Sequence, residues 1–439
     1  MKRILLVSLH FPPLPVVASE RAIAIARELH KLGWQVDVLT HDWQKIGNKW
    51  EPGIREFARS EEKDGITIHR IGAGKKWRMA DEYPTYSWLK NARTLGRWAR
   101  GWLDARPLSM DSHEAMHHWM DKANLSQRYD LLFGVFSPHT HLRLLHVFGK
   151  KTGIPVHVDF RDLWDNMVLS ERFQPSGSEK LRVPILLHYW KKWLKTPISL
   201  STVSLPWRDY LHDFSGKPCV AFGTGFHPSN YPEIEVSTEK FLVLHAGTLY
   251  SHQKLEIIVA GISLFLENES DSRIAIEFPG ALRPGVFPTP GSYLSNPEAF
   301  LRSKLNDCRV SMEPRIDPTL VRKRMKEASV LIMPTFPGVR GLHSGKLFDY
   351  LGAGRFIAAC PSDMGVIAET IETSGCGKIC FTAEELAETL HERYKVWKEK
   401  PAGNSVEGYP GRELFSQENQ IKKLSDFLSE QLRVHPKKK

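Results

Sequence analysis

The sequence has few cysteines and no long apolar segment. Its 439 residues include five cysteines, too few and too scattered for the disulfide framework of a small secreted domain. Cys376 and Cys380 lie close together, but no second pair and no nearby histidine completes a zinc site. No apolar run approaches the ~20 residues that a membrane-spanning helix needs. The N-terminal Met-Lys-Arg-Ile-Leu-Leu-Val reaches a Pro-Pro loop too soon for a signal peptide. We therefore expect reduced, structural cysteines and a cytoplasmic protein.

Several motifs of cofactor and metal chemistry are also missing. There is no G-x-G-x-x-G, which argues against a dinucleotide-dependent oxidoreductase. There is no Asp-x-Asp pair and no His/Cys cluster with the spacing of metal ligands, so we expect neither a cofactor nor a metal. The net charge is +10, but the basic residues are spread along the chain. Because no zinc-finger, RNA-binding or homeodomain signature is present, nucleic acid is not expected as a partner.

What the sequence does have is an alternation of strand and helix patterns in two halves. Its length suits two domains of about 200 residues each. The predicted strands are 3–9, 34–40, 131–136, 156–160, 241–247, 274–278, 330–333 and 356–359. The predicted helices are 19–32 with Ser19 as its N-cap, one from 141, 253–266, 320–327, one from 345, one from 382, and 412–432. This alternation predicts two parallel-sheet α/β domains. A Pro-containing linker at 223–240 divides them into 1–225 and 226–411, followed by a final helix and basic tail, 412–439.

The segment 338–354 carries the strongest indication of a binding site. It follows the buried strand 330–333, is rich in glycine, and opens a helix near Gly345. A helix N-terminus after such a loop presents unpaired N–H groups and the positive end of the helix dipole to an anion. Lys346 in the first turn, where an acidic residue is usual, suggests a bound anion, and Asp349 one turn on suits a ribose diol. A solvated lysine and aspartate on a surface helix are equally compatible with these residues alone.

The segment Ser344-Gly-Lys-Leu-Phe-Asp-Tyr-Leu-Gly-Ala-Gly-Arg-Phe-Ile-Ala-Ala359 resembles the donor-site helix of GT-B glycosyltransferases. Within them it is most similar to the retaining, family-4-like enzymes that build cell-surface polysaccharides. The resemblance implies two facing Rossmann-like parallel-sheet domains, with a C-terminal helix that crosses back onto the first. It implies that Lys346 contacts the nucleotide diphosphate and Asp349 the ribose hydroxyls, with Ser344 and Gly345 at the same helix start. Many relatives carry a glutamate where Gly341 stands, so the contact to the transferred sugar is left open.

The turn from Gly247 to Lys254 supplies further candidates for donor binding. It resembles the family's G-x-L-x-x-x-K turn, in which a basic residue meets the diphosphate. The resemblance makes Lys254 that residue, although a solvated lysine at a helix start is the alternative. Thr248, which we include in the donor set, stands where many relatives have arginine. Arg340 flanks the same loop and can supply the missing contact.

A second group of candidates lies where the predicted strand 156–160 ends. The segment from His157 to Trp164 resembles the D-x-R-D-x-W of this branch. Ligands bind at the carboxyl edge of such sheets, so Asp162 and Arg161 are candidate catalytic residues, with Asp162 orienting the acceptor hydroxyl or the reacting phosphate. An internal ion pair between Asp159 and Arg161 is the equal alternative.

Three histidines and one arginine complete the candidates of the first half. The turn Ser137-Pro-His-Thr-His141 resembles the family's S-x-P-x-x-x-H and supplies His141 as a catalytic and His139 as an acceptor-binding residue. A lone histidine in a turn is, however, more often structural. His10 follows the first strand, at the place where acceptors dock in the family. Arg21, in the first turn of the next helix, is expected to face the cleft and bind the acceptor.

The segment 184–195 is the candidate for contact with an anionic membrane. Its apolar side chains, among them Trp190 and Trp193, fill one arc of a helical wheel, and its lysines lie opposite. This is the pattern of an interfacial helix and equally of a helix packed on a core. A second helix, 88–105, has the pattern of a packed helix with a basic outer face.

The resemblance leads us to predict a glycosyltransferase that moves a sugar from a nucleotide-sugar to a glycan or glycolipid acceptor in surface polysaccharide assembly. The resemblance implies retention of anomeric configuration without a protein nucleophile. The expected partners are the donor, the acceptor and an anionic membrane surface. Two alternatives stay open: a sugar-nucleotide epimerase of the same fold, and a non-catalytic protein that binds nucleotide-sugars.

Overall fold

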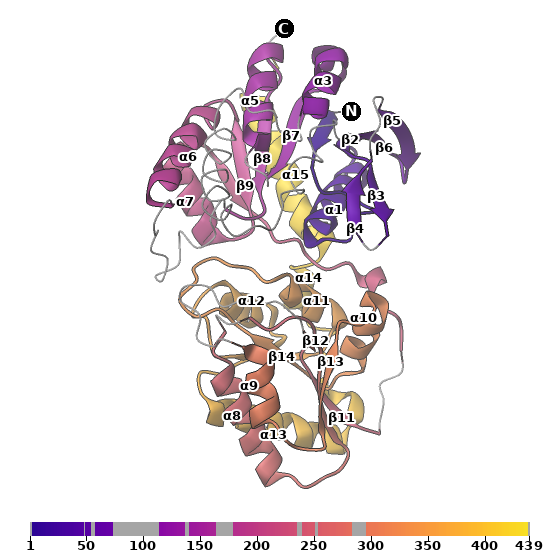
Figure 1. Cartoon of the computed structure of the whole chain (residues 1–439), viewed down its shortest axis with the longest axis vertical. Coiled ribbons are helices and arrows are strands. Elements are labelled where there is room, and N and C mark those ends of the chain that lie inside the picture. Colours follow the sequence, from indigo (N-terminus) through magenta and orange to yellow (C-terminus); the bar gives the residue numbers. More distant parts are fainter. Residues whose placement is uncertain are drawn as a thin grey trace, which may run out of the picture. The chain divides into compact units, whose positions relative to one another are not determined.

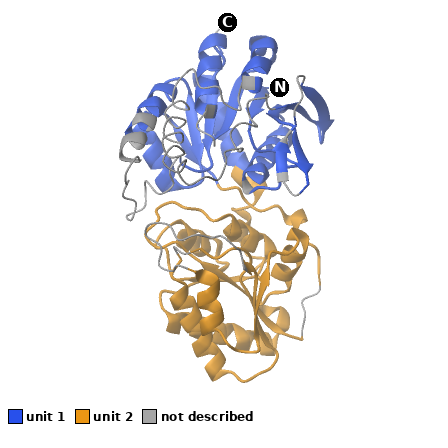
Figure 2. Cartoon of the chain, viewed as in Figure 1, with its two compact units in different colours: residues 1–166, 174–222, 421–439 blue, residues 167–173, 223–420 orange. Residues whose placement is uncertain are grey.

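The computed structural model describes residues 2–47, 49–53, 58–72, 114–136, 140–163, 179–234, 239–250, 253–282 and 296–437. The chain divides into two compact units (Figure 2). Among the described residues, unit 1 takes the chain as far as Phe222 and again from Ile421, and unit 2 takes Gly223–Gln420. The division falls at the start of the linker segment 223–240. The predicted helix 88–105 lies outside the described residues.

Unit 1 is built on an eight-stranded sheet with the order β10-β9-β8-β7-β1-β2-β6-β5. Its strands are β1 (Arg3–Val7), β2 (Gln35–His41), β5 (Arg59–Lys63), β6 (Ile66–Ile71), β7 (Leu131–Phe136), β8 (Val156–Phe160), β9 (Ser199–Thr202) and β10 (Cys219–Ala221). All neighbours pair parallel except β5, which is antiparallel to β6. A separate hairpin joins β3 (Trp43–Ile46) to β4 (Lys49–Pro52). The chain order reverses between β1 and β7, and ligands bind at such a reversal in open α/β sheets.

The helices of unit 1 surround this sheet (Figure 1). They are α1 (Val17–Lys31), α3 (Glu114–Lys122), α4 (Leu125–Arg128), α5 (Thr140–Thr152), α6 (Glu179–Trp193), α7 (Leu205–Ser215) and most of α15 (Gln417–Val434). The predicted N-cap Ser19 lies inside α1, because extended Val16 caps the helix and its carbonyl accepts the Ser19 N–H at 2.9 Å. The apolar face of α1 and the C-terminal helix α15 pack in one core with β1 and β2. The return of the C-terminal helix to the first domain is therefore confirmed.

The final helix is interrupted, where the sequence predicts one helix over 412–432. The structure has a short α14 (Pro410–Glu413) before α15. Between them the backbone pairs with Phe226, which donates to the Phe415 carbonyl at 3.1 Å and accepts from the Gln417 N–H at 2.8 Å. These bonds use backbone groups that a continuous helix would need, so the helix restarts at Gln417.

Helix α6 packs into the core of unit 1. Trp190, Trp193 and Leu194 are at most 2% exposed, and the Trp190 ring lies 5.2 Å from Phe136 and 5.7 Å from Phe160. Because these apolar side chains are buried against the protein, they cannot enter a lipid headgroup region. The core-packing interpretation of 184–195 is therefore correct for these three side chains, and the contact of the segment with a membrane stays a prediction.

Unit 2 has a six-stranded sheet, all parallel, with the order β13-β12-β11-β14-β15-β16. Its strands are β11 (Phe241–Leu244), β12 (Ile274–Leu282), β13 (Val310–Pro314), β14 (Val330–Pro334), β15 (Phe356–Cys360) and β16 (Gly377–Ile379). From β11 the chain builds outward through β12 and β13, then returns to β14 on the other side of β11. The order of the strands therefore reverses between β11 and β14.

Helices cover both faces of this sheet, as Figure 1 shows. They are α8 (Leu255–Asn268), α9 (Pro297–Lys304), α10 (Pro318–Glu327), α11 (Gly345–Ala353), α12 (Val366–Ser374) and α13 (Ala383–Glu399). Successive residues of β11 point to opposite faces: Phe241 and Val243 join the core under α8 and α13, and Leu242 and Leu244 join the core under α11 and α12. The prediction of two parallel-sheet, Rossmann-like α/β domains is confirmed.

The predicted absence of an apolar spanning segment can be checked on the helices. Within the described part of the chain, no helix combines the length and the hydropathy that crossing a bilayer requires.

Candidate donor site in unit 2

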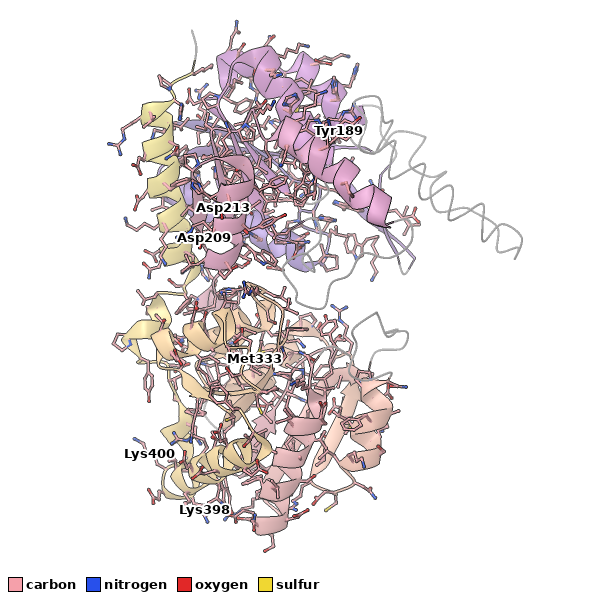
Figure 3. The ribbon with its side chains drawn as sticks, turned by 90° about the vertical axis from the view of Figure 1, so that its left-hand side faces the viewer. Tyr189, Asp209, Asp213, Met333, Lys398 and Lys400 are labelled. Carbon is pink, nitrogen blue, oxygen red and sulfur yellow. The ribbon has the colours of Figure 1, made fainter. Side chains whose placement is uncertain are left out.

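The candidate site lies at the carboxyl ends of β11 and β14, where the strand order of unit 2 reverses. The two strands pair directly, Val243 with Val330 and Leu244 with Leu331. Their following loops therefore start side by side, and this is the position where open α/β sheets bind ligands. Met333, near the end of β14, is labelled in Figure 3.

Helix α11 starts the site from the β14 side. Its N-cap Ser344 is extended and makes no side-chain cap hydrogen bond within the described residues, and Gly345 is exposed. The helix is held by Leu347, Phe348 and Leu351, which are at most 4% exposed. Its N–H groups at the first turn therefore stay directed at the sheet edge without a capping side chain, which suits an anion.

The neighbouring helix α12 has its N-terminus filled by the chain itself. The Asp363 carboxylate accepts from the backbone N–H groups of Gly365, Ile367 and Ala368 at 3.2, 3.0 and 3.0 Å. An internal carboxylate thus satisfies the partial positive charge of α12. Of these two helix starts at the same edge, α11 is the one that offers its N–H groups to an external anion.

Lys346 lies in the first turn of α11 and points back to the loop after β11. Its Nζ donates to the Thr248 carbonyl, lies 3.3 Å from His245 Nε2 and sits 5.7 Å from the centre of the Tyr250 ring. Burial lowers the pKa of the Lys346 ammonium to about 7, and Asp349 acts in the opposite direction. An anion would stabilise the charged form of this buried lysine, because it would replace the solvation by water that the ammonium has lost.

Asp349 lies one turn after Lys346 on α11. The Tyr231 hydroxyl donates to Asp349 Oδ1 at 3.1 Å, and the carboxyl group is partly buried. The two oxygens of a carboxylate accept several hydrogen bonds, so Asp349 can accept from Tyr231 and also from the two hydroxyl groups of a ribose. Burial and Asp349 together raise the pKa of Tyr231 well above its usual value, so Tyr231 remains a donor.

Gln253 joins the two loops of the site, a role that the sequence did not reveal. Its buried side chain accepts from the Tyr250 N–H at 2.8 Å and donates to the Pro334 carbonyl at 3.1 Å. The Tyr250 ring then lies 5.8 Å from that of Phe336. The loops after β11 and β14 are therefore fixed to each other before any ligand binds.

The other predicted donor residues lie on the same loops. Thr248 contributes its backbone carbonyl to Lys346 rather than its side chain. Lys254 is the residue before α8, and Arg340 is exposed in the loop before α11. Gly341 has a φ of +74°, which disfavours any residue with a Cβ. The backbone thus accounts for a glycine at this position, where the enzymes that the segment resembles often carry glutamate.

Three predicted residues of unit 1 come together at the edge of its sheet. Arg161 and Asp162, just after β8, form an ion pair. Burial, and after it the nearby Arg161 charge, lower the pKa of His10, just after β1, to about 4. His10 is therefore neutral at physiological pH, and the three side chains form a polar group where β1 and β8 end. Their assignment to acceptor binding and catalysis stays a prediction.

The assignment of Arg21 to acceptor binding needs correction. Its guanidinium donates twice to the Asp159 carboxylate, at 2.7 and 2.8 Å, and reaches the Phe222 carbonyl at 3.4 Å. Both charged side chains are at most 1% exposed. The internal ion pair proposed for Asp159 therefore exists, but its partner is Arg21 from α1 instead of Arg161. Arg21 cannot reach a bound ligand without leaving this pair.

The histidines after β7 differ from the prediction as well. His141 is fully buried at the start of α5, and its Nδ1 lies 2.8 Å from the Val135 carbonyl. This contact to β7 matches the structural alternative and not a catalytic group exposed to substrate. His139 lies outside the described residues.

A metal site can be searched for among the same residues. Among the side chains that the structure describes, no group of three or more His, Cys, Asp or Glu is placed to hold a metal ion.

Comparison with known proteins places the fold. No protein family matches the sequence, and no curated protein matches it. A sucrose-phosphate synthase from Thermosynechococcus elongatus is 16% identical, with a TM-score of 0.63 over 99% of this chain and 100% of that chain. A glycosyltransferase from Rickettsia africae is 12% identical, with a TM-score of 0.60 over 98% and 99%. A UDP-forming α,α-trehalose-phosphate synthase from Burkholderia xenovorans, in complex with glucose-6-phosphate, is 12% identical, with a TM-score of 0.56 over 98% and 100%.

These matches cover nearly all of both chains, so they include the elements of both units. The fold is GT-B, as the sequence predicted. At such low identity the likeness shows the fold alone. The narrower likeness to family-4 enzymes stays a prediction.

Proposed function

We propose that this protein is a glycosyltransferase that transfers a sugar from a nucleotide-sugar to an acceptor hydroxyl. The observation that carries the proposal is Lys346 at the uncapped start of α11, at the strand reversal of unit 2. The cation and the row of N–H groups can bind a diphosphate, and the nearby Asp349 carboxylate can accept hydrogen bonds from a ribose. The proposal also draws on the GT-B neighbours, whose names describe sucrose-phosphate and UDP-forming trehalose-phosphate synthases.

The proposed chemistry is electrostatic stabilisation of the leaving group. As the bond between sugar and diphosphate breaks, negative charge grows on the diphosphate, and Lys346 together with the α11 N-terminus stabilises it. We assign Lys254 and Arg340, on the loops of the same site, to stabilising the same negative charge on the diphosphate. In the retaining scheme the leaving phosphate takes the proton of the acceptor hydroxyl, so the protein needs no nucleophile. We assign the acceptor to the His10, Arg161 and Asp162 group of unit 1, and infer a glycan or glycolipid of surface polysaccharide assembly.

Transfer and its two alternatives can be separated in one experiment. The purified protein is incubated with radiolabelled UDP-sugars, with and without candidate acceptors, after a thermal-shift screen has selected the donor. A ligand at 100 times its dissociation constant adds about 2.7 kcal/mol of stability. Label that moves only when acceptor is present supports transfer. An epimerised donor without acceptor would instead identify an epimerase, and binding without turnover a non-catalytic protein.

We expect turnover to be independent of divalent metal. Lys346, the α11 N-terminus and the neighbouring basic residues supply the positive charge that Mg²⁺ or Mn²⁺ would otherwise bring to the diphosphate. Activity should therefore persist in excess chelator. Loss of activity in chelator, restored by adding a metal back, would contradict this scheme.

Asp349→Asn should weaken nucleotide binding through the ribose alone. The amide keeps the size of the carboxylate but loses one acceptor and the charge, so UDP affinity should fall by about 1 kcal/mol. Pyrophosphate has no ribose, so its affinity should stay within twofold of the wild-type value. Calorimetric titration of both ligands measures the difference. An equal loss of affinity for both would show that Asp349 acts through Lys346 and not by contacting the ribose.

A further inference from the structure

His245 is a buried histidine that the proposed reaction does not use. It follows β11 directly, is 1% exposed, and lies 101 residues before Lys346 in the sequence. Burial, and after it the Lys346 charge, lower the pKa of His245 well below its usual value. The imidazole is therefore neutral and carries a single ring proton.

The position of that proton follows from the partners of the ring. Nδ1 lies 3.1 Å from the Ile332 carbonyl of β14, which can only accept. The Tyr350 hydroxyl lies 3.3 Å from the same nitrogen and accepts the Ala246 N–H at 2.9 Å, and the Gly247 backbone also hydrogen-bonds to the ring. Because the Lys346 ammonium, 3.3 Å from Nε2, can only donate, we place the ring proton on Nδ1, which leaves Nε2 as an acceptor.

The contact fixes where the Lys346 charge lies. An ammonium has three N–H groups; one goes to the Thr248 carbonyl and one to His245 Nε2. Both partners belong to the loop after β11, whereas the lysine itself starts α11. The two acceptors hold the long side chain across the strand reversal, with its remaining N–H group available to an anion.

We propose that His245 is a positioning residue, whose neutral imidazole accepts a hydrogen bond from Lys346 and holds the ammonium at the start of α11 for a diphosphate. This inference rests on the proposed function for the identity of the anion. The contact between the two side chains does not depend on that function, because it is formed without any ligand.

The arrangement makes diphosphate binding depend on pH. The titratable groups that face Lys346 are Asp349 and, through His245, Tyr350 from α11, and His245 and Tyr250 from the loop after β11. The anion binds the charged lysine, whose pKa in the free protein is about 7. Affinity should therefore fall as pH rises above about 7, by up to tenfold per pH unit. Below about pH 6 it should fall again, because the terminal phosphate gains a proton.

Two substitutions of His245 separate positioning from packing. His245→Phe keeps a ring but removes the acceptor, and His245→Gln keeps an acceptor near the position of Nε2. The phenylalanine variant should bind UDP about tenfold more weakly, with the alkaline fall in affinity beginning at lower pH. The charged lysine loses a hydrogen-bond partner there, so its pKa drops further. The glutamine variant should recover most of the UDP affinity and most of the wild-type pH profile. Tyr350→Phe, which leaves the contact to Lys346 in place, is the matched control.

The measurements are calorimetric titrations with UDP and with pyrophosphate from pH 6 to 9, with thermal unfolding of each variant. Unchanged affinity and pH profile in His245→Phe would overturn the proposal. So would a glutamine variant as weak as the phenylalanine one, because His245 would then act by packing. If the wild type binds pyrophosphate with this pH profile but no UDP or other nucleotide, the proposed function fails and the positioning role stands.

A measurement on the wild type needs neither a variant nor a ligand. Nitrogen-15 NMR of the ring distinguishes protonated from unprotonated nitrogens. We expect the proton of His245 on Nδ1. A proton on Nε2, toward Lys346, would overturn the proposal even if His245→Phe does not fold.

Discussion

Replacing Arg21 by methionine should destabilise unit 1 by about 3–5 kcal/mol, because it leaves the Asp159 carboxylate buried without a counter-charge. The pair joins α1 to β8 across 138 residues, and Ser201 donates to the same carboxylate at 2.7 Å. Methionine fills a similar volume but can neither neutralise the carboxylate nor donate to it. Urea unfolding, followed by the fluorescence of the buried tryptophans, measures the loss.

Two further variants make this result specific to the buried charge. Arg27→Met is the matched control on the same helix, since the Arg27–Asp64 pair is exposed and such pairs contribute about 0–1 kcal/mol. The double variant Arg21→Met, Asp159→Leu removes both charges and should recover much of the lost stability. A double variant as unstable as Arg21→Met would show that methionine at 21 fails for steric reasons.

Lys346→Ala should weaken UDP binding by roughly 1.5–3 kcal/mol, the contribution of a charge-assisted hydrogen bond. Transfer should be slowed further, since the charge on the leaving diphosphate grows as the sugar bond breaks. The free energy of unfolding should change little or rise slightly near neutral pH, because the variant no longer has to bury an ammonium that water solvates poorly.

Calorimetric titration with UDP measures the binding loss, and single-turnover kinetics measures the transfer step. Lys398→Ala is the matched control: Lys398 is exposed in the last turn of α13, at the end of unit 2 away from Met333 (Figure 3). The UDP affinity of the Lys398→Ala variant should equal that of the wild type. UDP affinity unchanged in Lys346→Ala would refute the donor site itself, whatever the kinetics.

Much of the site could be found from sequence because it is local. A buried strand, a Gly-rich loop and a helix start occupy consecutive residues, so 330–354 predicts an anion site with Lys346 and Asp349 one turn apart. The structure has these elements as β14 and α11. Thr382 likewise caps α13 by accepting the Glu385 N–H at 3.2 Å, and this contact lies within four consecutive residues, as in a capping box.

The partners of these residues could not be found in the same way. His245 follows one strand and Lys346 follows another, and only the pairing of β11 with β14 brings them together. Gln253 has no sequence signal at all, because a glutamine before a helix is ordinary on any surface. Its buried position between Tyr250 and Pro334 is what makes it part of the site.

The periodicity of the sequence by itself determined the two α/β halves and most of their elements, since helix and strand patterns depend on neighbours a few residues apart. Amphipathic patterns leave open what the apolar face meets, and so α6 matched a membrane helix as well as a core helix until Trp190 was found against Phe136 and Phe160. A charged residue near the start of a helix is equally ambiguous: Arg21 is buried in an ion pair with Asp159, whereas Lys346 contacts His245 in the loop after β11. Only the tertiary structure decided between these alternatives. The order of the strands selects which distant side chains meet in the protein interior, where a charge is stable only beside a suitable partner.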